Sequence, residues 1–495
     1  MKLILKFCFI LSFSFLTSPK ITAQQFAWAP TVKIKNNFYQ YYVGESGTGS
    51  VLLMSKYSIR KDFRQTYYNT DHSIKLWGKP DNEITLVKFD NNQNLKTANP
   101  FMFKNALSVF YEAFISDNMY FVYCSIKNNK CILYADIYST DDKFIRTETL
   151  RELKSFATND NELDNNFSLI SSENHQYIAI KDYDGIITFY DGQMKKIWDY
   201  KFEYSFLTDI EIKDNGLAFA IGGTDKSASL IAFDILAKKT NTTQINIDKQ
   251  NSVEDLHLTV NHGLIYVTYF YGLQGDKTQF YFGPRRFIEF FANGIVEEVF
   301  DMKTLVSKNK FKVPFSNETL LKVTEKKKIE KIKGLEWFSN KNMFVSEVGE
   351  LVVVFEKEYT VSTSMSDQYG RVIRVDYATV DEDIICMKIN ADGTSKQSVI
   401  KRKSKGQSQY DYLLSSNSFY EKGKLYIMYN EGTSSYKLVN HILSENLQET
   451  SMTETKTYGE HDVYLAIRNA KKMKDGNYKV FGREGKNVSS AIIKF

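Results

Sequence analysis

Proline and cysteine are both scarce in this chain of 495 residues, which contains six prolines and four cysteines. A strand that donates backbone hydrogen bonds on both sides cannot accommodate proline, so the low count permits long, uninterrupted β-ladders. Cys124, Cys131 and Cys386 lie beyond the amino-terminal region. This odd number, in a large domain, excludes a dense disulfide framework. Pairing Ile126 with Cys131 would place Cys124 opposite Leu133, so we expect buried thiols there instead of a disulfide.

A strong excess of one charge is also missing. The 64 basic residues outnumber the 59 acidic residues by a formal +5, and the two signs are interleaved along most of the chain. Nucleic acid is therefore not an implied partner.

Familiar catalytic motifs are absent as well. None of the six histidines has helical metal-ligand spacing, there is no HExxH or G-x-x-x-x-G-K motif, and there is no sialidase-type Asp box. His257 and His262 flank a turn, and we expect ordinary strand or turn histidines there instead of a metal pair.

The only apolar run of note is short and lies at the amino terminus. Lys2 and Lys6 precede the run from Phe7 to Leu16, and a small residue, Ala23, follows. This layout predicts a signal peptide over residues 1–23, since the run is far shorter than the ~20 apolar residues that span a bilayer. We expect export to the periplasm, cell surface or medium, and a mature chain without a transmembrane segment.

What the sequence has in abundance is the strand pattern. Between Gly349 and Asn430, apolar residues recur at every second position in runs of about six residues, which is typical of half-buried strands. These apolar positions are Val352, Val354, Ile385, Met387, Ile389, Ile427 and Tyr429. Asp392-Gly393 predicts a hairpin turn, because glycine accepts the positive φ that a primed turn needs.

The same pattern recurs along the chain with a spacing on the order of 40 to 50 residues, the period of four-stranded propeller blades. Strand pairs are expected around Asn215-Gly216 and around Gly222-Gly223, and Trp198 is expected to pack between neighbouring blades. The sequence therefore predicts an all-β fold, a β-propeller of seven or eight four-stranded blades over residues 24–495. A two-domain all-β arrangement is the alternative.

One segment, about 316–334, has helical character. Ser316-Asn317 can cap a helix that carries Leu320 and Leu321, and Gly334 can end it. Lysines 326–328, 331 and 333 make the segment basic, as either a docking arm over one face or a solvated insertion between blades.

The densest polar and aromatic group predicts a ligand or partner surface. Its members are Glu356, Glu358, Tyr359, Tyr369, Arg371, Arg374 and Asp383, with Asp381 and Glu382 beside them. Loops at a propeller face present such residues to a ligand, and arginines can grip carboxylates through forked hydrogen bonds. Paired carboxylates could instead act as the acid and base of a glycosidase.

A second polar group, TNDNELDNNF, carries oxygen ligands at alternate positions. Asp160, Glu162, Asp164 and Asn166 could surround a calcium ion, although the segment lacks the glycine and glutamate of an EF-hand loop. The other interpretation is a solvated loop between blades. No other cofactor is expected.

The run from Asp255 to Gly432 resembles a family of uncharacterised exported β-propeller-like proteins of Bacteroidota. The shared features are VEDLHL followed by GLIYVTYFYG, a lysine-rich insert, a stretch ending at Glu358-Tyr359, the DEDIICMKINADG hairpin and the LYIMYN strand. The hairpin here lacks the tryptophan that usually follows its turn. The resemblance implies a propeller at the cell envelope and no particular reaction.

These observations favour an exported, non-catalytic propeller that serves as a binding or scaffold protein, with a protein or glycan of the cell envelope as its partner. A secreted carbohydrate-active hydrolase on the same scaffold is the alternative.

Overall fold

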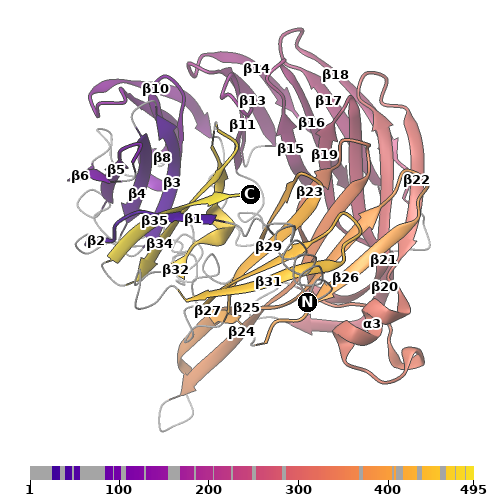
Figure 1. Ribbon diagram of the computed structural model, residues 1–495. Helices are drawn as coiled ribbons and strands as arrows, with labels where there is room; N and C mark the ends of the chain where they lie inside the picture. The colour runs from indigo at the N-terminus through magenta and orange to yellow at the C-terminus, as the bar shows by residue number, and fades with distance from the viewer. Residues whose placement is uncertain are drawn as a thin grey trace, which may run out of the picture.

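The computed structural model is an all-β ring (Figure 1). It describes residues 25–33, 39–46, 49–55, 84–92, 94–101, 108–127, 130–153, 168–182, 185–204, 206–224, 227–247, 252–280, 286–366, 372–403, 406–408, 416–431, 437–456, 464–473, 475–484 and 487–495. The strands form eight antiparallel sheets that follow one another around the ring as blades. The predicted propeller is confirmed, and its blade number is eight.

The first four blades use consecutive strands. Blade 1 contains β3 (Tyr39–Ser46), β4 (Gly49–Ser55), β5 (Ile84–Phe89) and β6 (Leu95–Pro100). Blade 2 contains β7 (Ser108–Ile115), β8 (Met119–Lys127), β9 (Lys130–Tyr138) and β10 (Phe144–Leu153). Blade 3 contains β11 (Ser168–Ser171), β12 (Tyr177–Lys181), β13 (Ile186–Asp191) and β14 (Lys196–Lys201). Blade 4 contains β15 (Phe206–Ile212), β16 (Leu217–Thr224), β17 (Ser227–Asp234) and β18 (Lys239–Ile245).

The next three blades are built in the same order. Blade 5 contains β19 (Ser252–Asn261), β20 (Leu264–Phe280), β21 (Arg286–Asp301) and β22 (Ser307–Pro314). Blade 6 contains β23 (Phe338–Val345), β24 (Leu351–Ser366), β25 (Val372–Ile389) and β26 (Ser395–Ile400), with β27 (Gly406–Ser408) added beside β25. Blade 7 contains β28 (Asn417–Glu421), β29 (Lys424–Glu431), β30 (Lys437–Leu443) and β31 (Glu449–Lys456).

Blade 8 joins both ends of the chain. It contains β32 (Tyr464–Leu465), β33 (Lys471–Lys472), β34 (Tyr478–Glu484) and β35 (Asn487–Lys494), together with β1 (Gln25–Trp28) and β2 (Val32–Lys33). β1 pairs antiparallel with β35, from Gln25 opposite Lys494 to Trp28 opposite Ala491. Strands from the two ends therefore share one sheet, which closes the ring and limits exposed sheet edges.

The first strand of each blade lies nearest the ring axis. β11, β15, β19, β23 and β28 each contact the next of these strands around the ring. Side chains from these innermost strands therefore surround the central channel.

The blades pack through buried apolar side chains on both of their faces. In β24, Val353 and Phe355 pack against blade 5, whereas Val352 and Val354 pack against Ile427 of blade 7. All four β24 residues are at most 1% exposed. The strands that the alternating pattern predicted are therefore present, but they are buried on both sides, because each blade lies between two neighbours.

Several local predictions can be compared with the backbone. The Asp392-Gly393 turn is confirmed, with Gly393 at φ 83°. The predicted turn at Gly222-Gly223 is wrong, because both glycines lie inside β16. A Cβ on Gly222 would lie only 2.8 Å from the ring of Tyr204, so this glycine makes room for an aromatic side chain.

The expected cysteine register and tryptophan packing are both confirmed. Cys131 pairs with Ile126, which places Cys124 opposite Leu133. Trp198 on β14 stacks on Phe189 of its own blade, at 5.6 Å between ring centroids, and contacts Phe233 of blade 4 at 6.3 Å.

The helical insertion is shorter than predicted. α3 (Asn317–Thr324) begins at the expected cap, where the Ser316 side chain accepts a hydrogen bond from the Thr319 backbone, and it ends at Glu325 in the left-handed conformation. A short 3₁₀ turn, η2 (Ile329–Lys331), follows, and a second, η3 (Ile467–Asn469), lies in blade 8. Gly334 does not end a helix. It lies against β21, where a Cβ would be 2.8 Å from the Ala292 carbonyl oxygen. Within the described residues no helix is long and apolar enough to cross a membrane.

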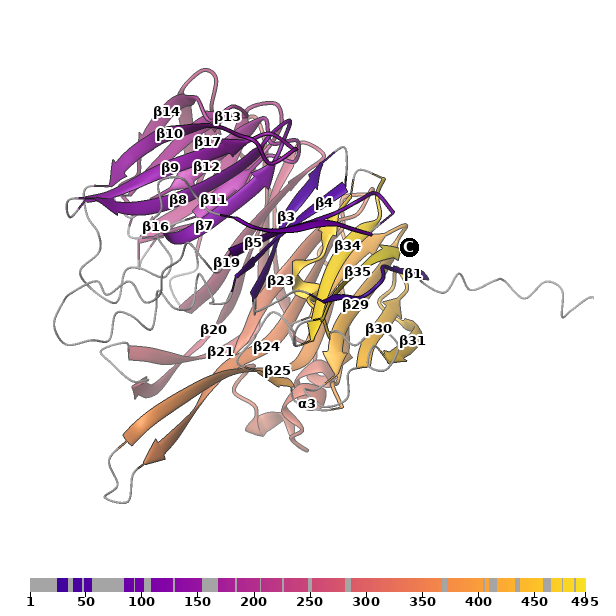
Figure 2. The ribbon, with the colours of Figure 1, turned by 90° about the vertical axis from the view of Figure 1, so that its left-hand side faces the viewer.

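Two neighbouring hairpins are much longer than the others. β20 and β21 have 17 and 16 residues, and β24 and β25 have 16 and 18. Both project from the same side of the ring, which we call the hairpin face (Figure 2). Because the strands alternate in direction, β22 ends, and β19, β23 and β28 begin, toward this face.

Candidate functional site

The carboxylates that the sequence singles out lie at the base of the β24–β25 hairpin. Glu356 pairs with Ile384, whereas Glu358, two residues further on, pairs with Asp381. β25 therefore contains one extra residue here, a β-bulge, and bulges change the face to which side chains point. Alternation along the strands divides the predicted ligand surface between the two faces of blade 6, and the bulge places Asp381 on the face of Glu356 and Glu358 and leaves Glu382 and Asp383 on the other.

The first group faces blade 7. Glu356, Glu358 and Asp381 each place one carboxylate oxygen within 4.8 Å of the others. Glu356 and Asp381 are both 0% exposed. The guanidinium of Arg402 pairs with Glu356, and the backbone N–H of Ser416 in blade 7 donates to both Glu356 oxygens, at 3.1 and 3.2 Å. This group therefore joins blades 6 and 7.

A second cation, Lys341, completes this cluster. It pairs with Glu358 and lies 4.0 Å from Glu356. Burial and the neighbouring Glu356 carboxylate raise the pKa of Asp381 to about 7, although Arg402 opposes the shift. The three oxygens are close enough to hold a cation, but Lys341 and Arg402 already supply two positive charges.

The second group lies on the other face of the blade. The Tyr359 hydroxyl donates to Glu382 at 2.7 Å. Lys401 bridges Asp383, at 2.8 Å, and Glu325 at the end of α3, at 2.9 Å. These contacts tie the hairpin base to the helical insertion, so the described members of the predicted surface form two structural clusters and not one exposed patch.

The remaining predicted residues have no described side chains. Tyr369 and Arg371 lie outside the described residues, and Arg374 lies in β25 opposite Met365. The predicted calcium ligands Asp160, Glu162, Asp164 and Asn166 also lie outside the described residues.

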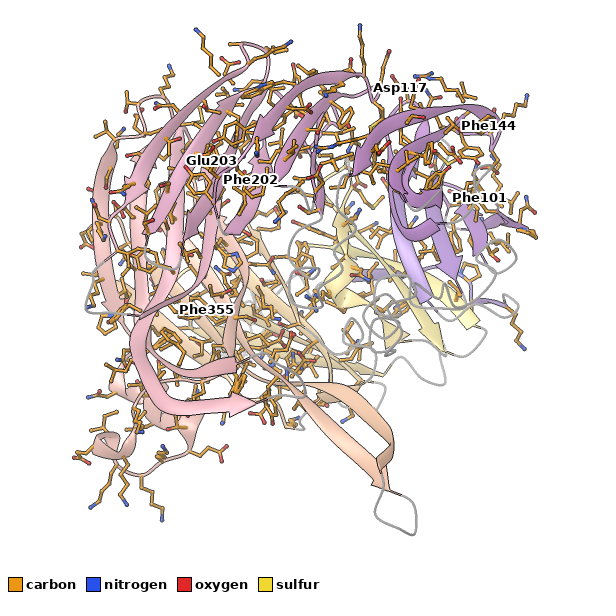
Figure 3. The ribbon with its side chains drawn as sticks, turned by 180° about the vertical axis from the view of Figure 1, so that it is seen from behind. Phe101, Asp117, Phe144, Phe202, Glu203 and Phe355 are labelled. Carbon is orange, nitrogen blue, oxygen red and sulfur yellow. The ribbon has the colours of Figure 1, made fainter. Side chains whose placement is uncertain are left out.

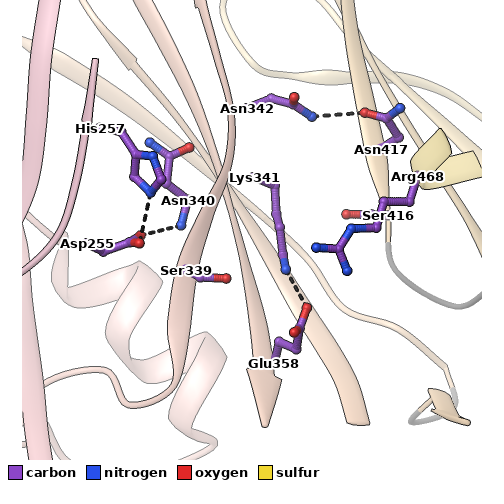
Figure 4. A pocket seen from close by; sticks show the side chains of 10 residues that line it. All are labelled: Asp255, His257, Ser339, Asn340, Lys341, Asn342, Glu358, Ser416, Asn417 and Arg468. Carbon is purple, nitrogen blue, oxygen red and sulfur yellow. Dashed lines mark hydrogen bonds and ion pairs between the residues drawn. The ribbon is translucent and has the colours of Figure 1, made fainter. Parts of the chain in front are cut away.

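A cavity of about 400 Å³ opens among the innermost strands (Figure 4). Blades 5 to 8 and their connections all contribute to it. Its lining residues are Asp255, His257, Ser339, Asn340, Lys341, Asn342, Glu358, Ser416, Asn417 and Arg468. Every one of these ten residues is polar or charged. Glu358 and Lys341 belong also to the carboxylate cluster, so the cluster forms one wall of the cavity.

His257 is held between two carboxylates on the cavity wall. Its Nδ1 lies 2.6 Å from Asp209 of blade 4, and its Nε2 lies 2.8 Å from Asp255. Burial alone would lower the pKa of His257, but the hydrogen bonds to both aspartates outweigh burial and raise the pKa to about 10. The imidazole is therefore a cation at neutral pH and a fixed link between blades 4 and 5.

Both aspartates adopt unusual backbone conformations. Asp209 has φ 41° and Asp255 has φ 59°, and both lie at register shifts in their strands. Asp255 also accepts a hydrogen bond from the Asn340 backbone at 2.6 Å, which links blade 5 to blade 6. Strained non-glycine residues at a cavity are a recognised feature of functional sites.

Asparagine side chains continue these links around the channel. Asn342 donates to the Asn417 side chain at 3.0 Å and to Ser418 at 2.7 Å, and Asn417 donates to the Ile467 carbonyl of blade 8 at 3.0 Å. The cavity wall is therefore a connected hydrogen-bond network across blades 4 to 8.

Sequence reasoning identified only Glu358 among the ten lining residues. His257 was considered as a metal ligand with His262, but His262 lies in the β19–β20 turn while His257 points to the cavity. Polar residues at alternate positions in the first strand of each blade could have located the cavity, as Asp255 and His257 do in β19 and Asn340 and Asn342 do in β23.

No family model matches the sequence, and no curated protein matches it. Among solved structures, the chain is similar to BamB from Moraxella catarrhalis, with 9% identity, a TM-score of 0.40 and coverage of 95% of this chain and 98% of that one. It is similar to the polysaccharide lyase Uly1, with 11% identity, a TM-score of 0.41 and coverage of 94% and 99%. It is similar to the C-terminal WD40 domain of Sif2, with 8% identity, a TM-score of 0.43 and coverage of 94% and 98%. These similarities carry no argument about function, and the propeller fold of this chain rests on its own eight sheets.

Proposed function

We propose that this propeller is an exported binding protein whose central cavity holds a polar segment of a protein or glycan at the cell envelope. The observation that carries the proposal is the lining of the cavity, in which all ten side chains are polar or charged. Such a lining suits a hydrated ligand that offers many hydrogen-bonding groups, such as a sugar or a peptide backbone. Export rests on the amino-terminal apolar run of the sequence.

The network around the cavity supports binding because it fixes the lining side chains. Asn342 and Asn417 are each bonded to a neighbouring blade, and His257 is bonded on both ring nitrogens. Side chains that are already ordered lose little conformational entropy when a ligand arrives.

A secreted carbohydrate-active hydrolase is the second candidate, favoured by the carboxylate cluster. Asp381, with a pKa raised to about 7, lies beside Glu356 and Glu358, as a proton donor beside a carboxylate would. However, Glu356 and Asp381 are 0% exposed, and Glu356 is held by Arg402 and the Ser416 backbone. Of the three clustered carboxylates, a substrate in the cavity would meet Glu358 alone, so we favour binding.

The proposal is tested by a substitution that narrows the cavity and removes none of the hydrogen bonds described above. Ser339→Phe adds a large side chain inside the cavity, and Ser307→Phe, on the exposed outer strand β22, is the matched control. Binding would be measured by titration calorimetry against a panel of neutral and acidic oligosaccharides and extended peptides. We expect the parent and the control to bind a panel member and Ser339→Phe to lose that binding.

Equal binding by both variants would contradict the cavity as the ligand site. Turnover of an oligosaccharide by the parent, lost in Glu358→Gln, would favour the hydrolase instead.

A further inference from the structure

The connection between blades 5 and 6 concentrates positive charge. Residues 303–333 contain ten lysines, three glutamates and no arginine, a formal charge of +7. The whole chain carries only +5, so everything outside this stretch is formally negative. We call residues 322–333 the lysine segment. Its six lysines, all exposed, are Lys322, Lys326, Lys327, Lys328, Lys331 and Lys333.

The charge of the lysine segment is only partly compensated by its two glutamates, Glu325 and Glu330. Lys326 donates to the Lys331 carbonyl at 3.0 Å, and Lys333 lies over the Phe291 ring at 5.2 Å. Of the two glutamates in the segment, Glu325 is paired with Lys401. Among the described residues, none of the six lysines forms an ion pair with a carboxylate. Six ammonium groups against two carboxylates, Glu325 and Glu330, leave a formal charge of +4 within twelve residues, and this creates a positive potential that attracts an anion.

The position of the segment limits what can reach it. It follows α3 at the rim of the ring, and side chains of this region point away from the ring (Figure 3). The β24–β25 hairpin extends further along the ring axis than α3 does (Figure 2). A flat surface approaching the hairpin face would meet the hairpin first, whereas a flexible linear chain could pass beside it.

We propose that the lysine segment captures a linear acidic polysaccharide. Lysines act as compact point charges on flexible stems, which suits repeated carboxylates on a polymer that needs no fixed register. Nucleic acid fits less well, because residues 317–336 contain no aromatic side chain for base stacking and no arginine for bidentate phosphate contacts.

This surface is separate from the central cavity and is tested separately. The probe is fluorescein-labelled alginate, a linear polyuronate, and binding is followed by fluorescence anisotropy at rising salt. The test variant is Lys326→Gln/Lys327→Gln/Lys328→Gln. The control is Lys195→Gln/Lys238→Gln/Lys239→Gln, which removes three exposed lysines from blades 3 and 4 and their turns.

We expect the parent to bind alginate but not uncharged dextran, with affinity falling as salt rises. The test variant should bind about tenfold more weakly, the control within about twofold of the parent, and both should keep the parent's melting temperature because the lysines are exposed. Ser339→Phe should leave alginate binding intact, which separates this proposal from the cavity.

Equal weakening in the test and control variants would overturn the proposal, since it would show attraction by overall charge only. No alginate binding at low salt, or tighter binding to a single-stranded oligonucleotide or to anionic lipid vesicles than to alginate, would overturn it too.

Discussion

Blades 3 and 4 meet mainly through aromatic and aliphatic side chains, whereas blade 6 meets both of its neighbours through apolar packing together with buried charge. Phe189, Phe233 and Ile231 fill the first interface. Glu356 and Arg402, at 0% and 2% side-chain exposure, lie in the interface of blades 6 and 7. Buried ion pairs add little net stability compared with apolar packing. Buried charge also occurs elsewhere in the ring, where Lys181 donates to the Leu207 carbonyl between blades 3 and 4 and Arg151 pairs with Asp182. The cluster of Glu356 differs because it also forms a wall of the cavity, where we propose that the ligand binds.

The largest expected effect comes from breaking the buried pair. Arg402→Met leaves the Glu356 carboxylate buried without its main cation, and loss of one partner from a buried pair costs about 3–5 kcal/mol of unfolding free energy. The adjacent Lys403→Met is the control, because Lys403 is 65% exposed and solvent screens its pairing with Glu454. Denaturant unfolding would measure both, and similar losses would remove the contrast between buried and exposed charge.

A buried carboxyl group in blade 5, Glu297, should make stability depend on pH. Glu297 in β21 is 3% exposed, and burial raises its pKa from 4.5 to about 8. Between these pH values the folded chain keeps a proton on Glu297 that the unfolded chain has lost. The free energy of unfolding is therefore highest below pH 4.5, falls as the pH rises, and has lost the whole contribution once the pH has passed 8.

Because glutamine cannot ionise, Glu297→Gln should abolish this fall in the free energy of unfolding with rising pH. We expect the parent to lose roughly 2–3 kcal/mol more than Glu297→Gln between pH 5 and 8. Denaturant unfolding at several pH values gives the difference directly. Parallel pH profiles for the two proteins would show that Glu297 titrates normally.

Blades 3 and 4 should respond to lost packing instead. Trp198 is half-buried between Phe189 and Phe233, so Trp198→Ala should cost about 2 kcal/mol, less than the 3–5 kcal/mol typical of a fully buried aromatic. Thermal unfolding would show this change without any change in ligand binding. An unaltered melting temperature would instead make Trp198 a surface residue available as a ligand platform.

The smallest expected change in stability concerns the arginines that the sequence assigns to a ligand surface. On that interpretation they face solvent, and Arg371→Ala/Arg374→Ala should leave the melting temperature within about 1 °C of the parent, because surface substitutions rarely exceed about ±0.5 kcal/mol. If these arginines contact a partner, capture from a cell-surface extract should fall in the same variant. Equal capture would remove them from the recognition surface.

The fold could be predicted because its causes are local. Strands are indicated directly by alternating apolar residues such as Val352 and Val354, and hairpins by turns such as Asp392-Gly393. The spacing of these strand pairs along the chain indicates the blades. The strand pairing that closes the ring could not be predicted, since β1 and β35 lie far apart in the sequence. The blade number follows only once that closure is known.

The site was harder to predict because it depends on contacts between blades. One extra residue in β25 brings Asp381, instead of Glu382, to the face that carries Glu356 and Glu358, and a bulge of this kind leaves no clear mark in an alternating sequence. Asp209 and His257 are 48 residues apart and belong to different blades. Their meeting at 2.6 Å follows from the ring geometry and not from any motif.

The most direct test of the account is diffraction from crystals soaked with whichever oligosaccharide or peptide the calorimetric panel identifies. The account predicts ligand density inside the cavity, within hydrogen-bonding distance of Asn340, Lys341 and Asn342. Full occupancy of the ligand at the rim or on the β24–β25 hairpin, with the central cavity holding only solvent, would contradict it.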